Sequence, residues 1–422
     1  MRGRLLLVLF GLTVGLLLAE GAARVRERFR CQSYCALYCD LNSFCGWWHA
    51  SDVRGWCQLC IGGRVEWRTY GRYNRRGLRD DRDIPYEPDG SFRILVLGDS
   101  FTEAHQVDPP FTALLERRLN AAAGRGRRFE VLNAGVSNWG TDNALLYFRS
   151  EGRKYRPDLV LLAFYTGNDV MDNYRQVLAP PWGVRADKPY FELRAGRLVL
   201  RHIPLPAEPR RDRVIRRLQH FLVARSALYR LLPSRPPSRR GVARAAPAPA
   251  RALPGQIFLT ETPEPYRVAW RITRGLVLAL RAAVEAHGGR FAVVIVNSRE
   301  EVCEGWRWTL TMQPAFRDSP HDFDKPNRLI IQFLRRKGIP AIPLLDAFRA
   351  EFGETEASFS ASTTTGPRPG TSWRPRSSPA RCGRRVSCRS PRGPIDPVPA
   401  PRYEPRAPCR SRAGFVPRSS SS

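Results

Sequence analysis

Three short polar clusters, each directly after an apolar run, hold residue types that could carry out acyl transfer. They are residues 98–102 (GDSFT), 133–135 (NAG) and 167–169 (GND). A serine hydroxyl becomes an effective nucleophile when a neighbouring base takes its proton. Backbone N–H groups and an asparagine amide can stabilise the negative oxygen of a tetrahedral intermediate. The clusters could therefore supply a nucleophile and oxyanion donors if the fold brings them to one place.

The pattern around the clusters predicts elements that would do this. Short apolar runs, typical of buried parallel strands, occupy 93–97, 129–133 and 159–163. Helix-like segments lie between them at 111–119 and 141–155. This alternation predicts a doubly wound α/β sheet, in which sites form outside the carboxyl ends of the strands. Taken singly, Ser100 could be a helix N-cap and Asn168-Asp169 a turn, so the inference depends on all three clusters occurring in order.

The segment 175–262 is expected to be an insertion in this domain. It contains a predicted hairpin at 190–201, a predicted arginine-rich amphipathic helix at 214–232 and a Pro/Arg/Ala linker at 233–254. The α/β alternation then resumes. The predicted order is a helix at 266–287, a strand at 290–297, a helix at 327–337 and a last strand at 339–345.

In order and spacing, the three clusters resemble the first three motif blocks of the SGNH/GDSL hydrolases. Ser100 matches the nucleophile of the first block, Gly135 the glycine of the second and Asn168 the asparagine of the third. The segment 76–80 (RGLRD), which precedes the first strand, resembles membrane-anchored bacterial members in particular. The resemblance extends over about residues 1–350.

The resemblance implies a three-layer α/β/α, flavodoxin-like domain that hydrolyses an ester, such as an O-acyl group on envelope carbohydrate. Ser100 would attack the acyl carbonyl. The N–H groups of Ser100 and Gly135 and the side-chain amide of Asn168 would stabilise the oxyanion. Asp99 would have a structural role, and no metal or organic cofactor is implied. Because position 102 is threonine, the Gly-x-Ser-x-Gly elbow of the α/β-hydrolase fold is not present here.

The family's fourth block, Asp-x-x-His, supplies the base, and this chain departs from it. The block should follow Phe352, yet no histidine occurs beyond His321. We therefore expect the SGNH-like domain to be incomplete at its carboxyl end, without its last loop and carboxyl-terminal helix. The literal match 318–321 (DSPH) precedes a predicted helix and the last strand, so we interpret it as coincidence. His105 is close to Ser100 in sequence but is expected to point along the loop. The remaining histidines have no supporting context: His49, His202, His220 and His287.

Because the block that supplies the base is missing, three classes of function remain open for this chain. We expect a serine esterase that is impaired in this chain. One alternative is a catalytically inactive binding or scaffold protein of the cell envelope that keeps the pocket. A second alternative is a basic protein that binds an anionic polymer, because the net charge is +30. Only four of the 69 basic residues are lysine, which suggests a GC-rich coding bias rather than nucleic-acid binding: Lys154, Lys188, Lys325 and Lys337.

The amino terminus is expected to direct the protein to the cell envelope, as a periplasmic or inner-membrane-anchored protein. The uncharged run 5–19 (LLLVLFGLTVGLLLA) suits a signal-peptide core, with small residues for cleavage at 21–23. An uncleaved anchor is the alternative. Arginines 24, 26, 28 and 30 argue against export, but long domains cross membranes largely regardless of such charge.

Composition divides the rest of the chain. Residues 24–90 form a Cys/Trp-rich segment without clear patterning, and its six cysteines could form disulfides in an exported protein. Cys57 and Cys60 form a lone C-x-x-C, a weak zinc or redox signal. Residues 91–354 are the predicted SGNH-like domain. Residues 355–422 are rich in Arg, Pro and Ser and are expected to be disordered, as a natural basic tail or as translation in a shifted reading frame.

Overall fold

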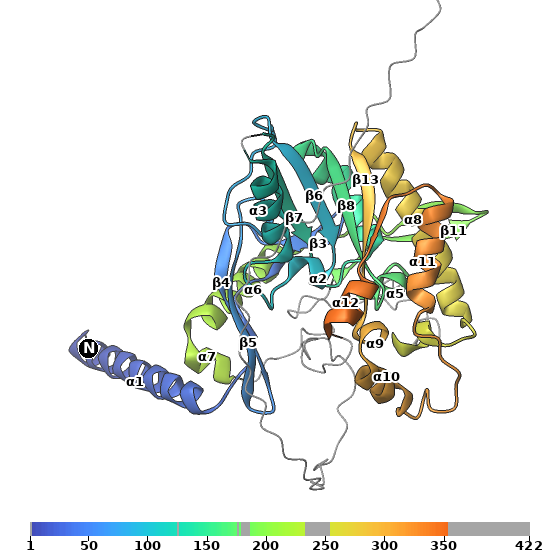
Figure 1. The fold of residues 1–422 in the computed structure, drawn as a ribbon. Coiled ribbons are helices and arrows are strands. Elements are labelled where there is room, and N and C mark those ends of the chain that lie inside the picture. Colours follow the sequence, from blue (N-terminus) through green and yellow to red (C-terminus); the bar gives the residue numbers. More distant parts are fainter. Residues whose placement is uncertain (1, 125, 175–176, 179–185, 233–253, 353–422) are drawn as a thin grey trace, which may run out of the picture. The chain divides into compact units, whose positions relative to one another are not determined.

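The computed structural model describes residues 2–124, 126–174, 177–178, 186–232 and 254–352. All of them belong to one unit, Met1–Thr364. Its centre is a five-stranded parallel sheet with strand order β14-β13-β8-β6-β7 (Figure 1). The strands are β6 (Phe92–Gly98), β7 (Phe129–Gly135), β8 (Leu159–Tyr165), β13 (Arg290–Val296) and β14 (Ala341–Pro343).

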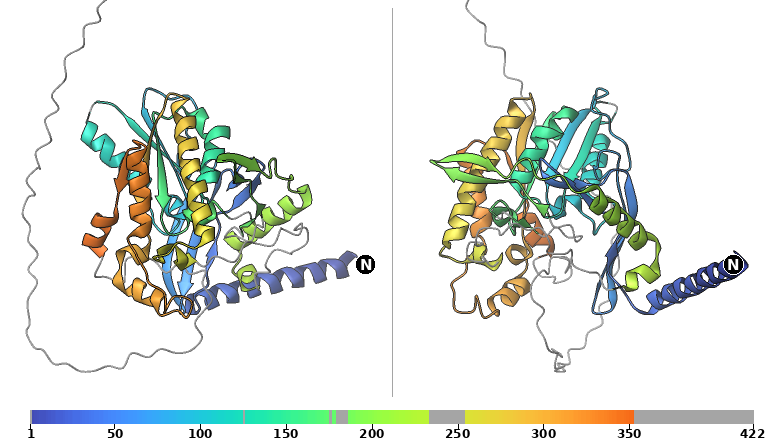
Figure 2. Two further views of the ribbon diagram at one scale, coloured as in Figure 1. Left: turned by 90° about the vertical axis from the view of Figure 1, so that its right-hand side faces the viewer. Right: turned by 180° about the vertical axis from the view of Figure 1, so that it is seen from behind.

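The sheet is covered by helices on both faces, which explains its nearly continuous apolar strands. On one face, Leu95, Leu162 and Val293 pack against α4 (Thr141–Ser150), α8 (Glu264–Glu285) and α11 (Lys325–Arg336). On the other, Val96, Leu161 and Val294 pack with residues of α3 (Phe111–Ala123). Figures 1 and 2 show α3 on the opposite side of the sheet from α8 and α11. The predicted three-layer α/β/α fold class is confirmed.

The segment 24–90 differs from the expectation of weak patterning, because it forms five short or irregular strands. They are β1 (Tyr34–Cys35), β2 (Cys39–Asn42), β3 (Gly46–His49), β4 (Val53–Ile61) and β5 (Arg64–Tyr73). Disulfides join Cys31 to Cys60 and Cys35 to Cys57, as the cysteine count suggested. The long β4–β5 hairpin has a register shift at Leu59/Cys60 and mixed burial, so it shows no clean alternation of polar and apolar residues.

The insertion is anchored to the sheet domain by a buried ion pair. Lys188 Nζ lies 2.7 Å from Asp142 Oδ2, and both side chains are fully buried. The predicted hairpin is confirmed as β11 (Tyr190–Arg194) and β12 (Arg197–Arg201). Its turn, Ala195-Gly196, has positive φ at both residues, as a two-residue hairpin turn requires. A two-residue pair, β9 (Val177–Leu178) with β10 (Ala186–Asp187), precedes it.

The helix predicted at 214–232 is two helices, α6 (Arg210–Arg225) and α7 (Ala227–Leu231). The break falls at Ser226, whose backbone is extended and whose hydroxyl accepts the Tyr229 N–H as the N-cap of α7. Of the predicted linker, only Pro254 is described, as the first residue of the 3-10 helix η2 (Pro254–Phe258).

Three short helices follow the carboxyl ends of the last strands. They are α9 (Arg299–Val302), α10 (Glu304–Thr311) and α12 (Leu345–Phe352). The last strand, β14, is shorter than predicted, since α12 already begins at Leu345. At the other end, α1 (Arg2–Phe29) is long and apolar enough to cross a membrane. The tail predicted at 355–422, and with it the inference that the last loop and helix are missing, lies outside the described residues.

Candidate functional site

The three predicted site residues lie at the carboxyl edge of three neighbouring strands. Gly98 at the end of β6 is in register with Gly135 at the end of β7 and with Ala163 in β8. Ser100 follows Gly98 by two residues and is half-buried at the start of α2 (Ser100–Glu103). Asn168 immediately precedes α5 (Asp169–Asp172), which follows β8. The edge predicted from the strand pattern therefore exists, with all three residues on it.

The turn that presents Ser100 is organised by Asp99 rather than by the serine. Asp99 is the extended N-cap residue of α2, and its Oδ1 accepts the Phe101 N–H at 2.9 Å. The reading of Ser100 as a helix N-cap is therefore wrong. As the first residue of the helix, Ser100 has an N–H for which the helix offers no acceptor. The hydroxyl and the N–H of Ser100 thus both lie at the start of α2, next to the carboxyl end of β6.

Gly135 must be glycine because α2 lies directly on the strand end. A Cβ at position 135 would lie 2.5 Å from Thr102 Cβ and closer still to the Glu103 nitrogen. A Cβ at Gly98 would lie 2.9 Å from the Ala163 carbonyl oxygen. The Gly135 N–H donates to Asn133 Oδ1 at 3.0 Å. An oxyanion would have to share this hydrogen with Asn133.

Asn168 is held by its backbone, which leaves its side chain for other partners. Its carbonyl accepts the N–H groups of Met171 at 2.8 Å and Asp172 at 2.9 Å. The side-chain oxygen is buried and has no hydrogen-bond partner among the described residues. The side chain also lies close enough to Asp99 to lower the pKa of that carboxyl. The next residue, Asp169, closes the turn by accepting the Tyr165 N–H at 2.9 Å.

Buried carboxyl groups accumulate beneath this edge. Burial, and then the negative charge of Asp172, raise the pKa of Asp99 to about 7, although the Phe101 N–H opposes the shift. Burial and the charge of Asp99 likewise raise the pKa of Asp169 well above its ordinary value. Near neutral pH Asp99 is therefore partly protonated, so the negative charge that it contributes next to Ser100 depends on pH.

Aromatic and charged groups flank the serine on the β8 and β13 side. The Phe101 ring stacks on Tyr165 with centroids 3.9 Å apart. After β13, Arg299 pairs with Glu300 at 2.9 Å, and its guanidinium lies 3.7 Å from the Trp306 ring centroid. Burial, and then the negative charge of Glu300, raise the pKa of the Tyr165 hydroxyl. The Arg299–Glu300 pair is therefore close enough to Tyr165 to act on it electrostatically.

Sequence reasoning missed Glu103, three residues after Ser100, as a connecting residue. Its buried carboxylate lies 2.8 Å from His49 Nε2 and 2.9 Å from His105 Nε2. It also accepts the Ser137 N–H at 2.7 Å and hydrogen-bonds the Tyr73 hydroxyl. Burial alone would raise the Glu103 pKa, but the charges of His105 and His49 hold it well below its usual range. The acidic residue directly after the motif was the available signal, but its partners are distant in sequence.

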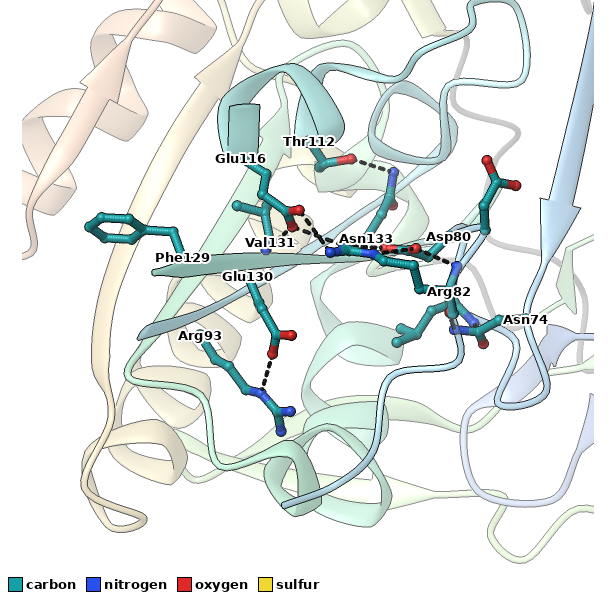
Figure 3. A network of polar contacts seen from close by, with 12 residues as sticks. Asn74, Asp80, Arg82, Arg93, Thr112, Glu116, Phe129, Glu130, Val131 and Asn133 are labelled. Atoms are coloured by element: carbon teal, nitrogen blue, oxygen red, sulfur yellow. Dashed lines mark hydrogen bonds and ion pairs between the residues drawn. The ribbon is translucent and has the colours of Figure 1, made fainter. Parts of the chain in front are cut away.

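The segment 74–82 is a second structural support of the site. The Arg79 guanidinium is buried and donates to the carbonyls of Ala104 and Val107, in the loop after α2. Figure 3 shows Arg82 between the carboxylates of Asp80 and Glu116, and Glu116 also accepts the Val131 N–H at 2.8 Å. The motif 76–80 therefore holds the nucleophile loop against α3 and β7.

All six histidines are described, and no hydrogen bond joins one of them to Ser100 among the described residues. The His105 ring, which was expected to point along the loop, pairs with the Glu103 carboxylate. His321 bridges to Leu259 and stacks on Phe323, between η2 and α11. His220 stacks on Tyr38, and His287 bonds the Ala283 carbonyl. His202 lies in the loop after β12.

One group of potential metal ligands occurs among the described residues. The Sγ atoms of Cys35 and Cys57 and a ring nitrogen of His105 lie within 4.8 Å of one another. Both sulfurs belong to one disulfide, which removes the thiolates that a metal would need. The residues as arranged therefore do not fit a metal ion.

No family model matches this sequence, and no curated protein matches it. Several solved structures are similar in fold. An acetyl xylan esterase is 10% identical and covers 61% of this chain and 80% of its own length, with a TM-score of 0.30. An acetylxylan esterase from Geobacillus stearothermophilus is 14% identical over 62% and 80%, with a TM-score of 0.29. A GDSL-like lipase from Bacteroides thetaiotaomicron is 10% identical over 62% and 73%, with a TM-score of 0.25. At this level of likeness, neither their activities nor their substrates transfer to this chain.

Proposed function

We propose that this protein is a serine ester hydrolase of the SGNH/GDSL type, with Ser100 as its nucleophile. One observation carries the proposal: the strands that precede the three motif clusters, β6, β7 and β8, are direct neighbours, and Gly98 is in register with Gly135. Three clusters that are distant in sequence thereby converge on one edge, where sites form in parallel sheets.

In the proposed reaction, Ser100 Oγ attacks the acyl carbonyl, and the bond to the alcohol breaks as the alcohol leaves with a proton. Water then hydrolyses the acyl-enzyme, which releases the free acid and restores the Ser100 hydroxyl. The developing oxyanion receives hydrogen bonds from the Ser100 N–H and the Asn168 amide. The Gly135 N–H contributes by sharing its hydrogen with Asn133. Each such donor is worth roughly 10²–10³ in kcat in other hydrolases.

The serine proton needs an acceptor, and the described residues offer no histidine for it. The Asp-x-x-His block is expected beyond Phe352, but no histidine follows His321 in this sequence, so the usual base is absent from this chain. For this chain we therefore propose a site with nucleophile and oxyanion donors but strongly reduced turnover. The commitment of both His49 and His105 to Glu103 also supports the second candidate, a binding protein that retains the pocket.

The substrate class follows from the resemblance and from α1. A helix long and apolar enough to span a membrane at the amino terminus supports a location at the cell envelope. We therefore propose O-acylated envelope carbohydrate as substrate, with the acyl group cleaved as the free acid.

Chemical rescue tests the assignment directly. Imidazole in solution can replace a missing base, so it should accelerate hydrolysis of p-nitrophenyl acetate by the full chain and leave a transient acetyl group on Ser100. The increment should vanish in Ser100→Ala but persist in Ser150→Ala, a matched control on α4 whose hydroxyl bonds the Leu146 carbonyl. The assignment is wrong if the increment survives Ser100→Ala. An absent increment and no acetylated peptide would favour the binding protein.

A further inference from the structure

Helix α6 presents an apolar stripe to solvent. Val214, Leu218 and Phe221 are 58%, 55% and 51% exposed, and their spacing of four and three residues places them on one helix face. Exposing large apolar side chains in a row is unfavourable, so such a stripe usually marks a binding surface.

The opposite face of α6 is firmly packed, which fixes the direction of the stripe. Arg216 is buried and donates to the Cys39 carbonyl at 3.0 Å and to Asp40 at 2.6 Å. One turn later, His220 stacks on Tyr38 with centroids 4.2 Å apart. Rotating the helix to hide the stripe would break these buried contacts.

Exposed arginines border the stripe. They are Arg210, Arg211, Arg213, Arg217 and Arg225. Arg225 also lies 4.4 Å from the Phe221 ring centroid, so its charge sits directly at the edge of the apolar surface. A helix with an apolar face and arginines around it is typical of helices that lie in the headgroup region of a membrane.

Helix α1 is the segment that could cross a membrane, and its contacts with α7 bring the end of α6 close to it. Residues Gly3–Phe29 have a stretch of mean hydropathy 2.2 that is not buried against the protein. Directly after the apolar run, the Glu20 carboxylate accepts the N–H groups of Ala227 at 2.9 Å and Leu228 at 3.0 Å, at the start of α7. About two turns further along α1, Glu27 pairs with Arg230 at 2.7 Å. Figure 1 shows α7 beside the inner end of α1.

We propose that α6 is an interfacial helix whose stripe of Val214, Leu218 and Phe221 inserts into the anionic membrane crossed by α1. Because Glu20 and Glu27 hold α7 where α1 leaves the apolar run, the end of α6 lies at the depth of the lipid headgroups. The arginines then pair with the anionic phosphates of the lipid headgroups. The proposal does not depend on the chemistry at Ser100.

The same contacts make α1 a retained anchor in this arrangement. Cleavage among the small residues 21–23 would remove Glu20 and leave the first N–H groups of α7 without their acceptor. The inner end of α1 therefore acts as part of the folded domain rather than as a disposable leader.

Photo-crosslinking of the full chain in proteoliposomes tests the proposal. p-Benzoylphenylalanine at position 218 or 221 should form lipid adducts, and several-fold fewer adducts should form from position 308. Trp308 on α10 is a matched control because it is 65% exposed and lies outside α6. Vesicles with phosphatidylglycerol should give more adducts than vesicles of phosphatidylcholine alone, and Arg210→Glu/Arg211→Glu should reduce that difference.

Three outcomes would overturn the proposal. Lipid adducts at 218 no more frequent than at 308 would show that the stripe does not reach the membrane. Adducts to a second copy of the chain would identify the stripe as a dimer surface. A mature protein that begins after residue 23 would show that α1 is not the anchor.

Discussion

His49 Nε2 lies 2.8 Å from Glu103 Oε1, and this buried pair joins the amino-terminal strands to the turn that carries Ser100. His49 ends β3, and its Nδ1 lies 2.7 Å from the Gly77 carbonyl, so the ring is fixed from both sides. Tyr73 at the end of β5 stacks on the same ring at 3.7 Å. The disulfide-bonded segment 24–90 is therefore packed against the turn that carries Ser100 and helps to fix its position.

Glu103→Gln should destabilise the protein by about 3–5 kcal/mol, because it leaves a buried histidine pair without its carboxylate. The lowered Glu103 pKa means that its contribution is present above its ordinary value of 4.5 and is lost as pH falls through the folded pKa. The cost of the substitution should therefore be smaller at pH 3 than at pH 7. Urea unfolding in detergent measures it. Glu285→Gln, which breaks an exposed pair with Arg281, should cost less than about 0.5 kcal/mol.

Gly135→Ala should destabilise by about 2 kcal/mol or more, since the new methyl group meets the backbone of α2 with no space to move. Gly275→Ala is the control. There a Cβ would lie 3.2 Å from the flexible Leu198 side chain, and alanine favours the helix by about 1 kcal/mol. Equal thermal stability of both variants would contradict the close packing of α2 on β7.

The sheet and its edge could be predicted because buried parallel strands leave a strong local signal. Each of the strands β6, β7 and β8 is apolar along nearly its whole length and ends in a polar cluster. The support of the site could not be predicted in this way. His49 and Tyr73 reach Glu103 from strands with irregular burial that lie at least 30 positions earlier in the sequence. Polar contacts of single residues leave no periodic pattern in the sequence. The break at Ser226 was also missed, because its cause is a cap supplied in part by distant Glu20.

Asp99→Asn should stabilise the protein more at pH 8 than at pH 4. The folded pKa of about 7 lies above the ordinary 3.8, so between these values the native state binds the extra proton and stability falls as pH rises. Asparagine keeps an oxygen for the Phe101 N–H without acquiring the buried charge. Each tenfold difference in proton affinity corresponds to about 1.4 kcal/mol, which makes the effect measurable in unfolding curves at the two pH values. A pH-independent difference between variant and parent would show that Asp99 does not titrate in this range.

Alkylation and mass spectrometry should distinguish the cysteines in the two disulfides from the buried free thiols. Among the described cysteines, Cys39 and Cys45 are free and buried, so their alkylation in the native protein should be slow and should increase on unfolding. Without reductant, peptides linked through Cys31–Cys60 and Cys35–Cys57 should appear in the mass spectrum. Cys57→Ser should cost about 3 kcal/mol, as removal of a disulfide that closes a short loop does. Recovery of Cys35 and Cys57 as free thiols from exported protein would contradict this pairing.

The base should be recoverable from the coding DNA. Globular patterning stops near Glu354, within a few residues of the expected Asp-x-x-His, and the sequence beyond is rich in Arg, Pro and Ser. We predict that another reading frame encodes Asp-x-x-His followed by an amphipathic helix. The protein made from that frame should exceed the 422-residue chain in ester hydrolysis by roughly 10³-fold or more, because nucleophile, base and oxyanion donors act as a unit.

In the restored protein, Asn168→Ala should lower kcat by roughly 10²–10³ with little change in KM, as expected for a donor that acts only in the transition state. Robust Ser100-dependent turnover by the 422-residue chain itself would refute this reading and would require a base among the histidines already described.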